Sequence, residues 1–142
     1  MAHVRSTTLR RKGRRGGALV ESAVVMPLVI LMVFGVIEYG WMFLKSQQIS
    51  NACRAGARAG ARWGATAATV NSAIQTSLTN DGFTSGQWSV ALTPSDPTVL
   101  SPGQALTVQV TVPYSNIAAI NIALIPTPTN LRASVVMARE GP

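Results

Sequence analysis

The stretch that decides the fold covers residues 14–44 and reads RRGGALVESAVVMPLVILMVFGVIEYGWMFL. Its residues 22–37 contain no charged side chain, and extension to the end of the stretch adds only Glu38. An apolar run of about 20 residues is long enough to cross a bilayer as a helix. We therefore expect a transmembrane helix over residues 18–44.

The segment before this run is a basic leader. The 142-residue chain has a net charge of +7, and half of its basic residues fall within residues 1–17, where there is no acid: Arg5, Arg10, Arg11, Lys12, Arg14 and Arg15. Basic residues beside a span hold that side in the cytoplasm. The leader shows no hydrophobic period, so we expect no regular structure there. We predict a single-pass inner-membrane protein with a cytoplasmic N-terminus and a periplasmic or extracellular C-terminal domain, and no binding of nucleic acid.

After the span, residues 45–79 are predicted to continue the helix outside the membrane. Glycine recurs at every fourth position, at Gly56, Gly60 and Gly64. Residues four apart lie on one helix face, and glycine costs about 1 kcal/mol in a helix interior. Three in register therefore indicate close helix packing, although a glycine-rich linker is the alternative. A parallel row of arginines on another face is expected to meet partners or phosphates: Arg54, Arg58 and Arg62.

Residues 80–142 change to a period of two, which is typical of strands. The clearest strand alternates Leu106, Val108, Val110 and Val112 with polar residues, and shorter patterns follow Trp88 and Leu131. Three short strands favour a small antiparallel sheet packed on one side against the helix. The fold class is thus α+β, a long N-terminal helix packed with a small antiparallel sheet. The apolar segment 114–130 could be a short helix or a loop capping the sheet near the membrane.

Little in the sequence favours catalysis. The only histidine is His3, in the leader, and no metal-ligand cluster, nucleophile elbow or phosphate-binding loop is present. We therefore predict no enzyme activity, no cofactor and no metal. Cys53 is the only cysteine, so an intrachain disulfide is excluded.

Two acids stand out because an ionised carboxylate in hydrocarbon is costly and marks a functional candidate. At 1.5 Å per residue, Glu21 and Glu38 lie roughly 25 Å apart along a helix, so each could reach water near one membrane interface. Glu38 fits this account because Tyr39 and Trp41 beside it resemble an aromatic belt. On that account, Glu38 should tolerate substitution better than Glu21.

Glu21 follows the basic leader closely, which gives it a second interpretation. If a peptidase cuts between Gly16 and Gly17, Glu21 becomes the fifth residue of the mature chain. In a stack of helices, the new α-amino group of one subunit can then pair with this carboxylate in its neighbour. Burial makes either charge costly alone and favours the pair.

These residues resemble a known family. RRGGALVE (residues 14–21), GVIEYG (35–40) and NACRAGAR (51–58) are similar to the first part of TadE-like pseudopilins, and LRASVVMARE (131–140) is similar to their final strand. The resemblance implies a pilin-like fold and a minor subunit of a tight-adherence (Flp-type) pilus, matured by a prepilin peptidase. Its partners would be other pilin or pseudopilin subunits, the inner-membrane assembly platform and lipids, with Glu21 and Glu38 in subunit assembly.

One position departs from the pattern. Ser22 follows Glu21, whereas the processed Flp pilins carry tyrosine there. A cut after Gly17 would make Glu21 the fourth residue instead of the fifth.

Two functions therefore stay open. The chain is either a structural pseudopilin-like subunit or an uncleaved, membrane-anchored envelope protein whose small β-domain binds a partner or ligand. The mature N-terminus separates them, because Gly17 or Ala18 there favours the first and an intact leader favours the second.

Overall fold

The computed structural model describes residues 14–120 and 124–142. Most of the leader, including His3, lies outside the described residues, as does Ile122. The chain divides into two compact units, Met1–Val36 and Ile37–Pro142. Helix α1 (Arg14–Ala61) contributes to both.

Helix α1 contains the predicted span. It is 48 residues long and continues through Pro27, and it is the one helix in the described part of the chain that is long and apolar enough to cross a membrane. The helix begins at Arg14, earlier than predicted, so Gly16 and Gly17 are helical rather than irregular. Helix propagation costs little once a nucleus exists, which explains why the apolar run extends the helix back into the leader.

The prediction of one helix over residues 45–79 is wrong, because α1 ends at Ala61 and a second helix, α2 (Ala67–Asn80), follows. Gly64 lies in the intervening turn with φ +78°, a backbone conformation that glycine adopts without a steric penalty. The Thr66 side chain then caps α2 by accepting a hydrogen bond from Thr69 N.

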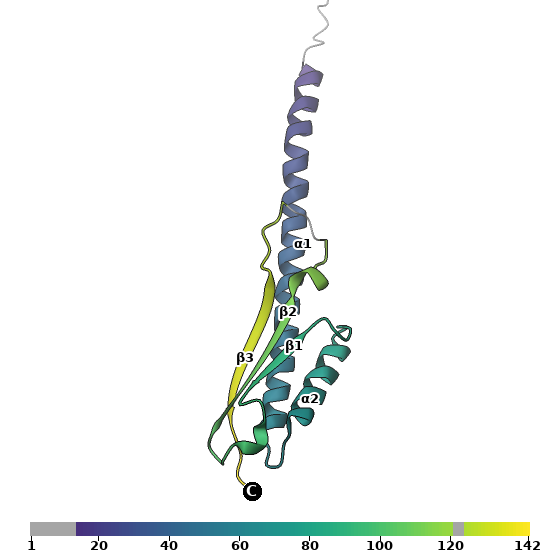
Figure 1. Ribbon diagram of the computed structural model, residues 1–142. Helices are drawn as coiled ribbons and strands as arrows, with labels where there is room; N and C mark the ends of the chain where they lie inside the picture. Colours follow the sequence, from purple (N-terminus) through teal and green to yellow (C-terminus); the bar gives the residue numbers. More distant parts are fainter. Residues whose placement is uncertain (1–13, 121–123) are drawn as a thin grey trace, which may run out of the picture. The chain divides into compact units, whose positions relative to one another are not determined.

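The second unit contains a three-stranded antiparallel sheet in the order β1-β2-β3 (Figure 1). Strands β1 (Ser89–Thr93), β2 (Ala105–Pro113) and β3 (Asn130–Ala138) are joined through short 3₁₀ helices, η1 (Pro97–Val99) and η2 (Tyr114–Asn116). These strands fall on the predicted alternating segments. The predicted α+β class, a long N-terminal apolar helix with a small antiparallel sheet, is confirmed.

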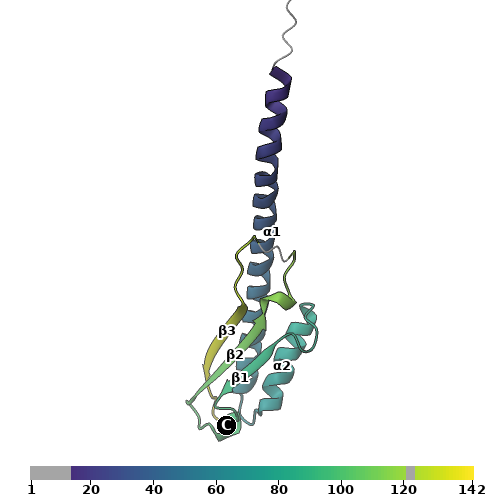
Figure 2. The same cartoon turned by 45° about the horizontal axis from the view of Figure 1, so that its top comes forward.

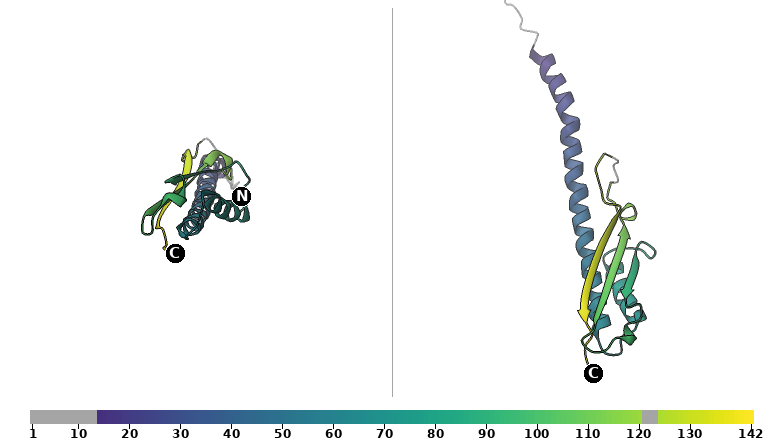
Figure 3. Two further views of the ribbon diagram at one scale, coloured as in Figure 1. Left: turned by 60° about the horizontal axis from the view of Figure 1, so that its bottom comes forward. Right: turned by 60° about the vertical axis from the view of Figure 1, so that its left-hand side comes forward.

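The core of this unit forms between one face of the sheet and the two helices (Figure 3). The alternating apolar residues of β2 are all fully buried: Leu106, Val108, Val110 and Val112. They belong to one cluster with residues of α1 (Ile49, Ala52, Cys53 and Ala57) and of α2 (Val70, Ile74 and Leu78). Strict alternation in β2 thus produces a sheet with one apolar face, which the helices cover.

Candidate functional site

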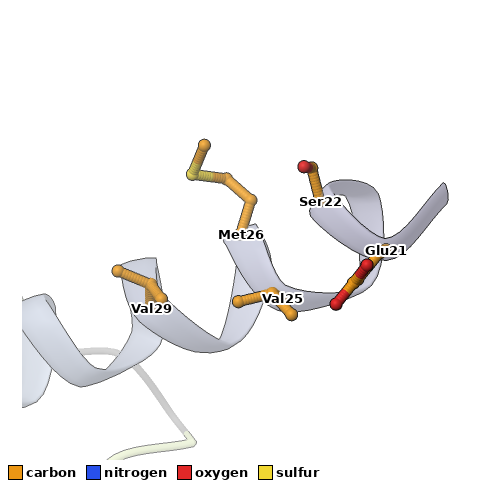
Figure 4. Close-up of a pocket in the computed structure, with 5 residues that line it drawn as sticks. All are labelled: Glu21, Ser22, Val25, Met26 and Val29. Atoms are coloured by element: carbon orange, nitrogen blue, oxygen red, sulfur yellow. The ribbon is translucent and has the colours of Figure 1, made fainter. Parts of the chain in front are cut away.

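Glu21 lies in the first unit, on the surface of α1. Its side chain is exposed and lines a shallow surface groove together with Ser22, Val25, Met26 and Val29 (Figure 4). Glu21, Val25 and Val29 follow one another at four-residue spacing and so share a face of the helix. The groove therefore presents one carboxylate within an otherwise largely apolar surface.

The predicted cleavage residues are also accessible. Gly16 and Gly17 are exposed, and a Cβ placed on either would meet nothing within 4 Å. Neither glycine is thus required by packing among the described residues, and the pair lies four to five residues before Glu21.

Glu38 is not at a water-exposed interface position, and that expectation is wrong. Only 1% of the residue is exposed. One carboxylate oxygen accepts a hydrogen bond from the Tyr114 hydroxyl, and the other accepts one from Ile120 N at 2.9 Å. The physical reason is that a buried carboxylate needs donors, and the second unit supplies two of them.

Tyr114 is the functional residue that sequence reasoning missed. It is buried at the end of β2, and burial together with its hydrogen bond to Glu38 raises the pKa of the phenol above its ordinary value. The hydroxyl therefore stays protonated and donates at any physiological pH. The available signal was a tyrosine placed directly after a buried strand, where its hydroxyl must find a partner.

Two more side chains of α1 hold the segment between β2 and β3. Tyr39 donates from its hydroxyl to Pro126 O at 2.9 Å, and Trp41 donates from Nε1 to Ile117 O at 2.6 Å. Figure 2 shows the chain on either side of residues 121–123 lying along α1. The described residues of this segment therefore form a short 3₁₀ helix and irregular chain, and Glu38, Tyr39 and Trp41 fasten them to α1.

Lys45 is also folded into the second unit. It is buried, donates from Nζ to Asp81 O at 3.2 Å, and places Nζ 4.3 Å from the centre of the Phe83 ring and 5.0 Å from that of Trp41. Cation–π contacts of this kind are worth about 0.5–2 kcal/mol. Lys45 thus stabilises the end of α2 against α1.

The glycine row is shorter than predicted. A Cβ on Gly56 would lie 2.5 Å from Ile74 Cγ1, and one on Gly60 would lie 2.8 Å from Val70 Cγ2 and closer still to Leu106 Cδ2. Both glycines allow α2 and β2 to approach α1 closely. Gly64 does not belong to this packing surface, because it lies in the turn after α1 and a Cβ there would meet nothing within 4 Å. The arginine row is exposed: Arg54, Arg58 and Arg62.

Cys53 is fully buried, and its thiol donates to Val108 O at 3.1 Å. Burial raises the pKa of the thiol, which suppresses the reactive thiolate.

We expect iodoacetamide to alkylate Cys53 of the native protein at pH 8 about 100-fold more slowly than Cys53 of the urea-unfolded chain, because reaction requires local opening. Equal rates, measured by mass spectrometry, would contradict the buried position.

Comparison with known proteins agrees with the resemblance in the sequence. A family model described as TadE-like protein matches residues 16–58, the part of α1 that includes Gly17, Glu21, Glu38 and Gly56. Searches among curated proteins and among solved structures gave no significant match. The match covers less than half of the chain, and the helix that contains it is long and apolar enough to cross a membrane. The TadE-like character predicted from the sequence is thus confirmed over residues 16–58.

Proposed function

We propose that this chain is a minor pilin or pseudopilin-like structural subunit of a Tad pilus or a related secretion or adhesion apparatus. The observation that carries the proposal is the exposed Glu21 carboxylate on an apolar helix, within the segment that matches the TadE-like family. Such a carboxylate is costly in a lipid environment unless a cation pairs with it.

A neighbouring subunit would provide that cation. Cleavage between Gly16 and Gly17 creates an α-amino group on the next chain, at the end of an equally apolar helix. In an assembly of parallel helices this ammonium group can reach the groove around Glu21. The pair is strong only when both charges are present, because either one alone is left buried and uncompensated.

A prepilin peptidase at the cytoplasmic face would make the cut. The two glycines are exposed and carry no side chain that would obstruct a protease. Because the cut precedes the apolar run, the mature protein keeps its span and stays anchored among the other subunits and the inner-membrane assembly platform.

This scheme requires the C-terminal unit to lie outside the cytoplasm. A reporter fused after Pro142 is expected to read as periplasmic, because the leader carries six basic residues before the span. Alkaline phosphatase and a cytoplasm-dependent fluorescent protein, fused separately, form a matched pair of reporters. A cytoplasmic readout would overturn both the cleavage and the assembly proposals.

The decisive experiment combines the mature N-terminus with a substitution at Glu21. Intact mass should show a chain beginning at Gly17 or Ala18. Glu21→Ala should still insert into the membrane but should co-purify with the pilus machinery at least about tenfold less, since loss of one member of a buried pair typically costs about 3–5 kcal/mol. Ser22→Ala, at the adjacent exposed position, is the control and should assemble normally.

The opposite result selects the other function. If Glu21→Ala assembles like the unchanged chain and the protein still begins at Met1 or Ala2, the subunit proposal is wrong. The chain is then an uncleaved envelope protein whose β-domain binds a partner or ligand.

A further inference from the structure

The second unit has an apolar end and a charged end. Glu38 and Ala61, both in the part of α1 that belongs to this unit, are about 35 Å apart at 1.5 Å per residue. At Ala61, the carbonyl accepts from Glu140 N, and Arg139 donates to Pro97 O. At Glu38 the chain has just left the apolar run, and no charged residue lies between Asp96 and Arg132 in the segment that packs there.

The apolar end carries six exposed large side chains, which we call the collar. It consists of Ile37, Tyr39, Trp41, Phe43, Ile120 and Leu124. The first four lie in the last part of the predicted span, residues 18–44 of α1, and the last two come from the segment between β2 and β3. Leu124 is 73% exposed, so nothing within the described chain covers it.

The hydrogen bonds of this end favour an apolar environment. Polar backbone groups of the β2–β3 segment are costly to bury unless they are paired. Three of them have side-chain partners from α1: Ile120 N bonds to Glu38, Ile117 O to Trp41, and Pro126 O to Tyr39. The Glu38 carboxylate accepts hydrogen bonds from Ile120 N and from the Tyr114 hydroxyl, so it needs no contact with water.

We propose that the collar contacts the membrane interface. In this arrangement Ile120 and Leu124 insert into the headgroup boundary of the bilayer beside α1. The collar includes residues of the predicted span that belong to the second unit, Ile37 to Phe43, and chain connectivity alone places this end of the unit next to the membrane. Tyr39 and Trp41 have the amphipathic rings that favour the membrane interface, and their polar atoms donate hydrogen bonds to the segment between β2 and β3. The loop thus anchors the β-domain at a fixed height on the membrane.

Fluorescence quenching by lipids tests whether Leu124 inserts into the membrane interface. The full chain, with Cys53→Ala, is labelled with the fluorophore NBD at Leu124→Cys or at Val99→Cys and reconstituted in phosphatidylethanolamine/phosphatidylglycerol vesicles at high dilution. Val99 is the matched control, because it is 69% exposed and lies in η1 at the charged end. Lipids brominated near the headgroup should quench the label at position 124 at least about twofold more strongly than the label at position 99, as expected for insertion to interfacial depth.

Each other outcome overturns the proposal. Equal quenching at both positions would place the loop in water. Protection of position 124 from iodide without quenching by brominated lipid would show that a protein surface covers it, and a loss of this protection on dilution would identify a second copy of the chain. The measurement does not depend on leader cleavage or on Glu21, so its failure would leave the proposed function standing.

Discussion

Glu38→Ala is expected to lower the free energy of unfolding of the Ile37–Pro142 unit by about 3 kcal/mol or more. The substitution leaves the Tyr114 hydroxyl and Ile120 N without acceptors, and each buried donor left unpaired costs about 1–3 kcal/mol. It also opens a cavity where the side chain lay, which adds to the loss. The β2–β3 segment should detach from α1 as a consequence. This reverses the order expected from the sequence, in which Glu38 was the more tolerant of the two acids.

Glu38→Gln is the matched control. Its amide oxygen can accept from Ile120 N, and its NH₂ group can donate to the Tyr114 oxygen, so the loss should be about 1 kcal/mol. Thermal unfolding of the full chain in detergent, followed by near-UV circular dichroism, compares the two. Tyr114→Phe in each background should show strong non-additivity, as expected for residues in direct contact. A Glu38→Ala protein that melts at the unchanged temperature would exclude a structural role for the carboxylate.

Gly60→Leu should destabilise the same unit by about 3 kcal/mol or prevent it from folding. The first added carbon already falls within 2.8 Å of Val70 Cγ2 and nearer still to Leu106, and the rest of the side chain has no space to enter. Overpacking of a core typically costs about 1–3 kcal/mol, and more where the backbone has to move. Because Gly60 lies beyond the span, membrane insertion should be unchanged, which membrane fractionation can verify.

Gly40→Leu provides the comparison for this variant. Gly40 lies in the same helix and the same unit, but a Cβ there would meet nothing within 4 Å. Both substitutions remove a helix glycine and add the same side chain, so the difference between their melting temperatures isolates the packing contact. Similar melting temperatures for the two variants would show that the close approach at Gly60 is not required.

The parts of the fold that depend on local patterns could be predicted from the sequence. The strict alternation from Leu106 to Val112 identified β2 because one face of that strand is buried and the other is not. The apolar run before Glu38 identified the candidate span, because the length and apolar composition of a helix decide whether it can cross a membrane.

Features that depend on distant partners could not be predicted. Glu38 is separated in sequence from Tyr114 by most of the second unit, and neither residue carries a local signal for the other. Gly64 shows that glycine spacing alone does not predict where a helix ends, because the four-residue period continues past the end of α1. Glycine serves close packing inside a helix and a positive φ beyond its end, and spacing alone does not distinguish these uses.

The order of elements along the chain also determines when the core can form during biosynthesis. The face of α1 that carries Ile49, Cys53 and Ala57 is made first, whereas β3 is made after the other helices and strands of this unit. The helix face therefore stays uncovered by β3 until that strand has left the ribosomal exit tunnel, and the unit reaches its native packing only then.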